Sequence, residues 1–217
     1  MRFIFEQIRV GGDRNFGYLL GDREAGVGVL IDPSYTPEAV VERALAQGLK
    51  ITHILNTHGH SDHTNGNAAA KALTGALVAG GLGHPGPLDR TLHDGERLAF
   101  GFYTLRVWEV PGHCDDHLAF LVEDQGAGFT GDLLFVGKVG GTPSQAEARR
   151  EWTSLQRLLT EWAPETTVWP GHDYGARPSS TMAWERRFNP FLEAGRVETF
   201  LSLKATWPDF KAEHGLR

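Results

Sequence analysis

The sequence is poor in the features that mark secreted, membrane-spanning or nucleic-acid-binding proteins. Its 217 residues include one cysteine, Cys114, which excludes an intramolecular disulfide and favours a reducing, cytoplasmic setting. The formal charge is −6 and lysine and arginine form no run, which disfavours nucleic acid as a partner. No signal peptide is recognised, and no apolar stretch approaches the roughly 18 residues of a membrane span, so no membrane association is expected.

The apolar segments that are present end at glycine, proline or aspartate and read as strands and helices of one domain. We expect strands at residues 2–8, 16–22, 26–33, 50–57, 97–113 (as a pair), 118–124, 126–135 and 166–175. Helices are expected at 36–48, 65–75 and 147–162. The tail from residue 179 onward is predicted to be helical, with breaks near Pro190 and Pro208.

One loop concentrates groups that bind metal ions. The stretch NTHGHSDHTNG, residues 56–66, contains His58, His60, Asp62 and His63 within six residues, directly after a predicted buried strand. So many imidazole and carboxylate groups in one loop would be unfavourable unless a cation lay between them. Both groups are ligands for zinc, iron and manganese at neutral pH, so the loop predicts a metal site.

Three more residues of the same types follow other predicted strands. His113 ends the motif PGH at 111–113, Asp132 ends TGD at 130–132, and His172 ends PGH at 170–172. Functional groups collect at such positions because strands hold the loops that follow them rigidly at one edge of a sheet. We therefore expect these three residues to join the histidine loop in one site.

The motif His-x-His-x-Asp-His, taken with the three later motifs, resembles the metallo-β-lactamase superfamily over about residues 15–192. The resemblance implies an α/β fold, a four-layer αββα sandwich. The catalytic domain would span residues 1–178, with a short C-terminal helical tail at 179–217 packed on the same domain. Two divalent metal ions are implied as cofactors; zinc is favoured, and iron and manganese are compatible.

The resemblance also divides the ligands between two ions. One ion would be held by His58, His60 and His113, and the other by Asp62, His63 and His172, with Asp132 bridging both. Two neighbouring ions would share a water and lower its pKa enough to supply hydroxide near neutral pH. Asp62 and Asp132 are the expected catalytic residues, because they would hold this hydroxide and relay its proton.

Two segments narrow the resemblance to hydroxyacylglutathione hydrolase (glyoxalase II): PGHDYG at 170–175 and NPFL at 189–192. This resemblance implies a hydrolase whose partner is a small-molecule thioester, ester or lactone. Tyr174 and Lys138 are the expected substrate-binding residues. The segment LLFVGKVGGT at 133–142 lacks the cysteine usual in that family, so recognition of glutathione itself is left open.

The same residues are compatible with two other functions. A mononuclear Fe(II) persulfide (sulfur) dioxygenase would use His58, His113 and Asp132 as a facial triad. A non-catalytic metal-binding scaffold is disfavoured by the complete ligand set. Near the ligands, His117 is expected to orient one of them, and Cys114 to be a buried thiol that points away from the site. The sequence leaves the oligomeric state open.

Overall fold

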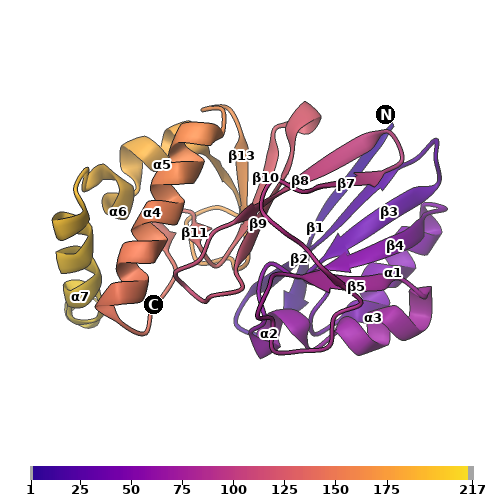
Figure 1. Cartoon of the computed structure of the whole chain (residues 1–217), viewed down its shortest axis with the longest axis horizontal. Coiled ribbons are helices and arrows are strands. Elements are labelled where there is room, and N and C mark those ends of the chain that lie inside the picture. Colours follow the sequence, from indigo (N-terminus) through magenta and orange to yellow (C-terminus); the bar gives the residue numbers. More distant parts are fainter. Residues whose placement is uncertain (1, 215–217) are drawn as a thin grey trace.

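Two six-stranded sheets face each other in the computed structural model, which describes residues 2–214 (Figure 1). The N-terminal sheet has the order β1 (Phe3–Gly11), β2 (Asn15–Asp22), β3 (Val27–Ile31), β4 (Lys50–Leu55), β5 (Leu77–Gly80) and β6 (Arg90–Thr91). The C-terminal sheet has the order β14 (Ser180–Thr181), β13 (Thr167–Pro170), β10 (Ala127–Gly131), β9 (Leu118–Val122), β8 (Tyr103–Glu109) and β7 (Arg97–Phe100). A short hairpin of β11 (Leu134–Phe135) and β12 (Lys138–Val139) follows β10.

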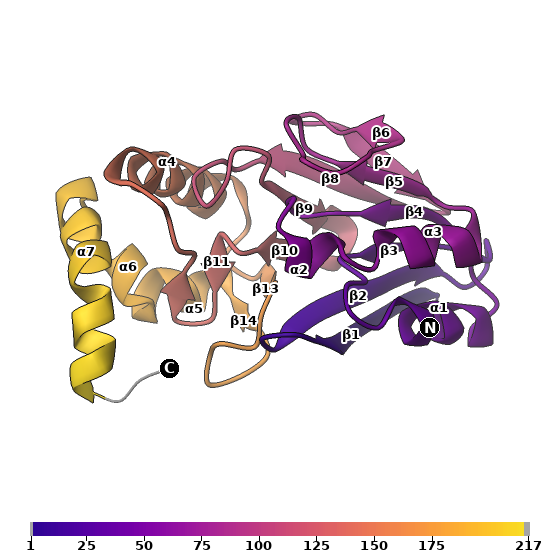
Figure 2. The same ribbon diagram turned by 90° about the horizontal axis from the view of Figure 1, so that it is seen from below.

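Helices cover the outer face of each sheet (Figures 1 and 2). The N-terminal sheet carries α1 (Pro37–Ala46) and α3 (Asn67–Thr74), and the C-terminal sheet carries α4 (Gln145–Glu161), α5 (Met182–Phe188), α6 (Pro190–Glu193) and α7 (Val197–His214). A single-turn helix, α2 (Ser61–Thr64), and a 3₁₀ turn at Glu123–Gln125 complete the elements. Among the residues described, no helix combines the length and the apolar character that crossing a membrane requires.

Three apolar clusters hold the layers together. One lies between the two sheets and includes Tyr18, Phe120 and Phe129, all buried. A second joins the N-terminal sheet to α1 and α3, and a third joins the C-terminal sheet to α4 and the three last helices. Burial of apolar surface on both faces of each sheet is the main force behind such a layered arrangement. The predicted four-layer αββα sandwich is confirmed.

The tail from residue 179 is mostly helical, as predicted, but only one of the two predicted helix breaks is present. Pro190 is the first residue of α6, directly after α5 has ended, as expected for proline at a helix start. The predicted break at Pro208 is wrong, because this residue lies inside α7. Trp207 packs against Phe191 of α6, with ring centroids 4.9 Å apart, and stacks on Phe210. These contacts on both sides of the proline hold the helix despite the lost backbone hydrogen bond.

The strand ends predicted to carry functional residues lie at one edge of the two sheets. His58 follows β4, His113 follows β8, Asp132 follows β10 and His172 follows β13. At the end of β10 the chain turns sharply at Gly131, whose φ is +49°. A side chain there would also collide with Thr57 and His117, so glycine is required where the two sheets approach each other. The turn delivers Asp132 into the space between the other ligands.

Candidate metal centre

The first three predicted ligands point at one another. The Nδ1 atom of His60 lies 3.0 Å from Nε2 of His58 and 3.0 Å from Nε2 of His113. Ligand nitrogens about 2.0–2.1 Å from a tetrahedral zinc ion lie about 3.3 Å apart, close to the spacing seen here. We call these three residues the first ligand group. Both distances are compatible with a single metal ion held between the three rings.

A second ligand group has the same spacing. The Nε2 atoms of His63 and His172 are 3.2 Å apart. Asp62 Oδ2 lies 3.4 Å from Nε2 of His172 and 3.6 Å from Nε2 of His63. Asp62 and His63 both lie on α2, the one-turn helix that places successive side chains of the histidine loop on this side of the site. These donors fit a second ion.

Asp132 lies between the two groups and faces both. Its Oδ2 atom is 3.3 Å from Nε2 of His172 and 3.7 Å from Nε2 of His113, and its Oδ1 atom is 3.4 Å from Nε2 of His63. The buried Oδ1 atom accepts no hydrogen bond from any residue that the structure describes. A buried carboxylate oxygen without a partner is costly, so this position suits a bridging ligand between two cations.

The second ring nitrogen of His113 and that of His172 each make a hydrogen bond to a backbone carbonyl. Nδ1 of His113 donates to the Gly141 carbonyl at 2.7 Å, and Nδ1 of His172 donates to the Asp13 carbonyl at 2.8 Å. A carbonyl can only accept, so both rings carry a proton on Nδ1, and Nε2 is the nitrogen that faces the metal site. Such anchoring is usual for metal-bound histidine and fixes the direction of its lone pair.

Asp32 anchors the remaining part of the histidine loop, and the sequence interpretation missed it. Its Oδ2 atom lies 3.0 Å from Nδ1 of His63 and accepts the Thr57 hydroxyl at 2.6 Å. Because that hydroxyl donates to Asp32, its oxygen can accept from Nδ1 of His58, 3.1 Å away. Asp32 is buried, with φ +46°. The available signal was an aspartate in the C-terminal part of a predicted strand, the same signal that identified Asp132.

Two more buried polar residues support the ligands. Asn15, also missed, donates from Nδ2 to Oδ2 of Asp62 at 3.0 Å. His117 accepts the Asp132 backbone N–H on Nε2 at 3.1 Å, and its ring stacks on His58 with centroids 4.9 Å apart. These contacts agree with the predicted orienting role of His117, which acts on Asp132 and His58.

The prediction that Cys114 points away from the site is wrong. Its sulfur lies within 4.8 Å of ligand nitrogens of His58 and His60. A tight turn, closed by a hydrogen bond from the Gly112 N–H to the Cys114 carbonyl, directs the thiol back toward the histidines. Burial raises the pKa of this thiol far above its ordinary value, and Asp116 beside it adds to the shift. The thiol is therefore neutral, and the predicted inert character holds.

Electrostatics distinguish the two ligand groups. Burial lowers the pKa of His58 and of His113, so these rings are neutral near pH 7 and ready to bind a cation. Burial also opposes the charging of His172, but its contacts with Asp132 and Asp62 raise its pKa to about 9. The pKa of His63 is likewise raised, against the effect of burial, chiefly by the negative charge of Asp132. Without metal, protons thus balance the carboxylates of the second group.

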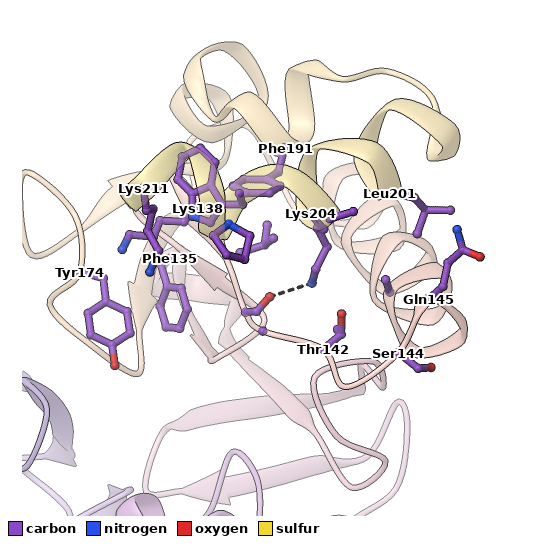
Figure 3. A pocket seen from close by; sticks show the side chains of 17 residues that line it. Phe135, Lys138, Thr142, Ser144, Gln145, Tyr174, Phe191, Leu201, Lys204 and Lys211 are labelled. Carbon is purple, nitrogen blue, oxygen red and sulfur yellow. Dashed lines mark hydrogen bonds between the residues drawn. The ribbon is translucent and has the colours of Figure 1, made fainter. Parts of the chain in front are cut away.

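A cavity of about 500 Å³ adjoins the second ligand group (Figure 3). Its walls come from the β11–β12 hairpin, the start of α4 and the inner side of α7. Tyr174 lines it and stacks on His172, with ring centroids 4.6 Å apart and planes 12° apart. Lys138 lines it too, its Nζ atom 4.9 Å from the Tyr174 ring centre. The structure brings both predicted substrate-binding residues to one cavity beside the metal ligands.

Comparisons with known proteins agree with this fold and site. The family model of the metallo-β-lactamase superfamily matches residues 11–103. A hydroxyacylglutathione hydrolase of Rhodospirillum rubrum is 41% identical over 181 residues, which cover 82% of this chain and 68% of that protein. The crystal structure of ETHE1 from Myxococcus xanthus superposes with a TM-score of 0.87 and 31% identity, covering 94% of this chain and 91% of that one. TTHA1623 in a di-iron-bound form gives a TM-score of 0.73 and 32% identity, covering 86% of this chain and 100% of that one.

The chain belongs to the metallo-β-lactamase superfamily. Within it, the sequence groups with the hydroxyacylglutathione hydrolases, as its later motifs predicted. The chain spans 62% to 68% of the length of the first of these relatives, so their complete activity is transferred here only as a proposal. The superfamily and its four-layer fold were both correctly predicted.

Weakening the contact between Asp32 and His63 should lower metal affinity even though no metal ligand is replaced. In Asp32→Asn the left-handed backbone is tolerated, but the charge that holds His63 is lost, and we expect metal affinity to fall by about 10-fold to 100-fold. The measurement is competition for zinc with a chromophoric chelator. Asp13→Asn is the matched control, because His172 is held by the backbone carbonyl of Asp13 and not by its side chain. Equal affinities in the two variants would contradict the anchoring role.

Metal uptake by the metal-free protein should release protons. At pH 7 His63 and His172 are protonated because their pKa values are raised, so binding of metal must displace roughly two protons. Titration calorimetry in buffers of different ionisation enthalpy measures this number. Above the pKa of about 9 of His172, the release from that residue should vanish. Uptake of two ions at pH 7 with no proton release would show that His63 and His172 are already neutral in the metal-free protein.

Proposed function

We propose that this chain is a binuclear metallohydrolase that cleaves a small anionic thioester. The observation that carries the proposal is the pair of ligand groups joined by Asp132, each with donor atoms 3.0–3.7 Å apart. The first ion would be held by His58, His60 and His113, and the second by Asp62, His63 and His172. The donor set is nitrogen and carboxylate oxygen, which suits zinc and also iron or manganese.

The chemistry assigned to these ions is the activation of a shared water to hydroxide near neutral pH and polarisation of the substrate carbonyl. The chain's own carboxylates complete the machinery. A hydrogen bond with His172 and another from Asn15 hold the pKa of Asp62 well below its usual range, so this residue is ionised and can accept a proton from water. Burial opposes ionisation of Asp132, but the positive charge of His63 keeps its pKa low as well. Both carboxylates can therefore orient the attacking water.

Substrate recognition is assigned to the cavity beside the second ligand group. Phe135, Phe191 and Trp207 give its lining an apolar, aromatic part. Lys138 and Lys211 also line it and contribute ammonium groups (Figure 3). An apolar cavity with two cations suits an acyl thiol that carries carboxylates. The hydroxyacylglutathione hydrolase names of the relatives support a glutathione thioester within this class. Esters and lactones share the reaction and belong in the test panel.

A second candidate uses part of the same site. In a mononuclear Fe(II) sulfur dioxygenase, His58, His113 and Asp132 would form the facial triad, and the structure does bring these three together. The close superposition on ETHE1 supports the dioxygenase as the second candidate. A mononuclear dioxygenase would not use His63, His172 and Asp62 as metal ligands. Their donor atoms nevertheless have the spacing of a complete metal site. The second ligand group is therefore the reason to prefer the hydrolase.

One pair of variants separates the two candidates. For a binuclear hydrolase, His58→Ala and His172→Ala should each lower hydrolysis of a 2-hydroxyacyl glutathione thioester by about 100-fold or more, because each removes a ligand of one ion. Release of thiol, followed with a colorimetric reagent, measures the rate. His93→Ala, an exposed histidine far from the ligands, is the control and should keep full activity. A dioxygenase would instead consume oxygen with a glutathione persulfide, and His172→Ala would leave that uptake intact.

A further inference from the structure

A buried ion pair joins the C-terminal helix to α4 behind the metal centre. Lys204 of α7 pairs with Glu151 of α4; the Glu151 side chain is 0% exposed and that of Lys204 is 11% exposed. Neither residue belongs to a ligand group. Charged side chains are rarely buried so completely, and removing one partner of such a pair leaves the other charge without compensation. Because the pair holds both side chains in place, it also restricts the movement of the backbone segments that these two residues contact.

Lys204 also holds the segment that anchors a metal ligand. Its Nζ atom donates to the Gly140 carbonyl at 2.8 Å, the bond drawn as a dashed line from Lys204 in Figure 3. The next carbonyl along the chain, that of Gly141, accepts the Nδ1 proton of His113 at 2.7 Å. The hydrogen bond of Lys204 and the anchor of His113 are therefore on adjacent residues. A shift of the Gly140 carbonyl would carry the Gly141 carbonyl with it.

Glu151 supports His113 from the other side. Gly112, the residue before His113, has φ +146°, and a side chain there would lie 2.4 Å from the Cα atom of Glu151. The backbone leading to His113 therefore rests directly on α4 at Glu151. One turn further along α4, Ser154 donates to the Pro111 carbonyl at 2.7 Å. Both segments that fix the His113 ring, residues 111–113 and 140–141, are in contact with this ion pair or its helix.

We propose that Lys204 and Glu151 are a positioning pair that fixes His113 as a metal ligand, so that helix α7 controls the metal affinity of the first ligand group. The proposal rests on the ligand assignment made for the proposed function. Lys204 acts through the Gly140–Gly141 segment and touches neither ion nor reacting atoms. Its loss would free the Gly140 carbonyl, leave the buried Glu151 carboxyl group without its partner and loosen the carbonyl that orients His113.

The test is the stepwise metal affinity of Lys204→Met, a variant that keeps most of the side-chain length without its charge. Chelator competition with zinc should show one of the two ions bound about 10-fold or more weakly, and the other bound as in the wild type. Lys204→Arg, which keeps the donor and the charge, should restore most of the affinity. Lys211→Met, one further lysine on the same helix, is the matched control and should bind both ions normally.

A double variant separates positioning from a general loss of stability. Lys204→Met with Glu151→Gln removes both buried charges, so thermal unfolding should return toward the wild-type midpoint. If the pair positions His113, the weak ion should stay weak, because Gly140 still lacks its donor. Recovery of affinity together with stability would overturn the proposal, as would wild-type affinity for both ions in folded Lys204→Met. Wild-type protein that binds fewer than two ions would instead refute the proposed function.

Discussion

The Asp132 carboxylate is the interaction on which the rest of the site depends. Its two oxygens lie 3.3–3.7 Å from ring nitrogens of both ligand groups, and one of them has no hydrogen bond among the described residues. A buried anion in this position requires positive charge on both sides. Protonated histidines supply part of it without metal, and two cations would supply it more completely. The fold must therefore bring six donor groups around one carboxylate.

The two-sheet architecture meets this requirement by geometry. Strands from both sheets end at one edge, and each delivers one ligand or a short run of ligands. The apolar cluster between the sheets fixes their separation, so the loops beyond the strands keep their relative positions. The outer helices add a further level of control, since α4 supports the turn before His113 and α7 reaches the Gly140 carbonyl through Lys204. The same two helices contribute to the wall of the cavity beside the second group, so under our two proposals they would serve both substrate recognition and metal binding.

The sequence could identify the candidate ligands because their signals are local. His58, His60, Asp62 and His63 are adjacent in sequence, and the other three ligands follow recognisable strands. Asn15 and the Lys204–Glu151 pair could not be found in this way, because their partners lie 47 and 53 residues away and a lone polar residue carries no periodicity. The single turn of α2 is too short to produce a helical pattern. At Pro208, the packing of Trp207 against Phe191 of α6 outweighed the local rule that proline ends a helix.

The most direct test of a shared, two-ion centre is the metal content of the purified chain. Elemental analysis of protein prepared without added metal or chelator should give close to two divalent ions per chain, with zinc, iron or a mixture of both. Replacement of Asp132 by alanine should lower this number, because both ions share that ligand. A wild-type chain that holds a single iron ion, and gains no second ion on incubation with zinc, would contradict the binuclear account.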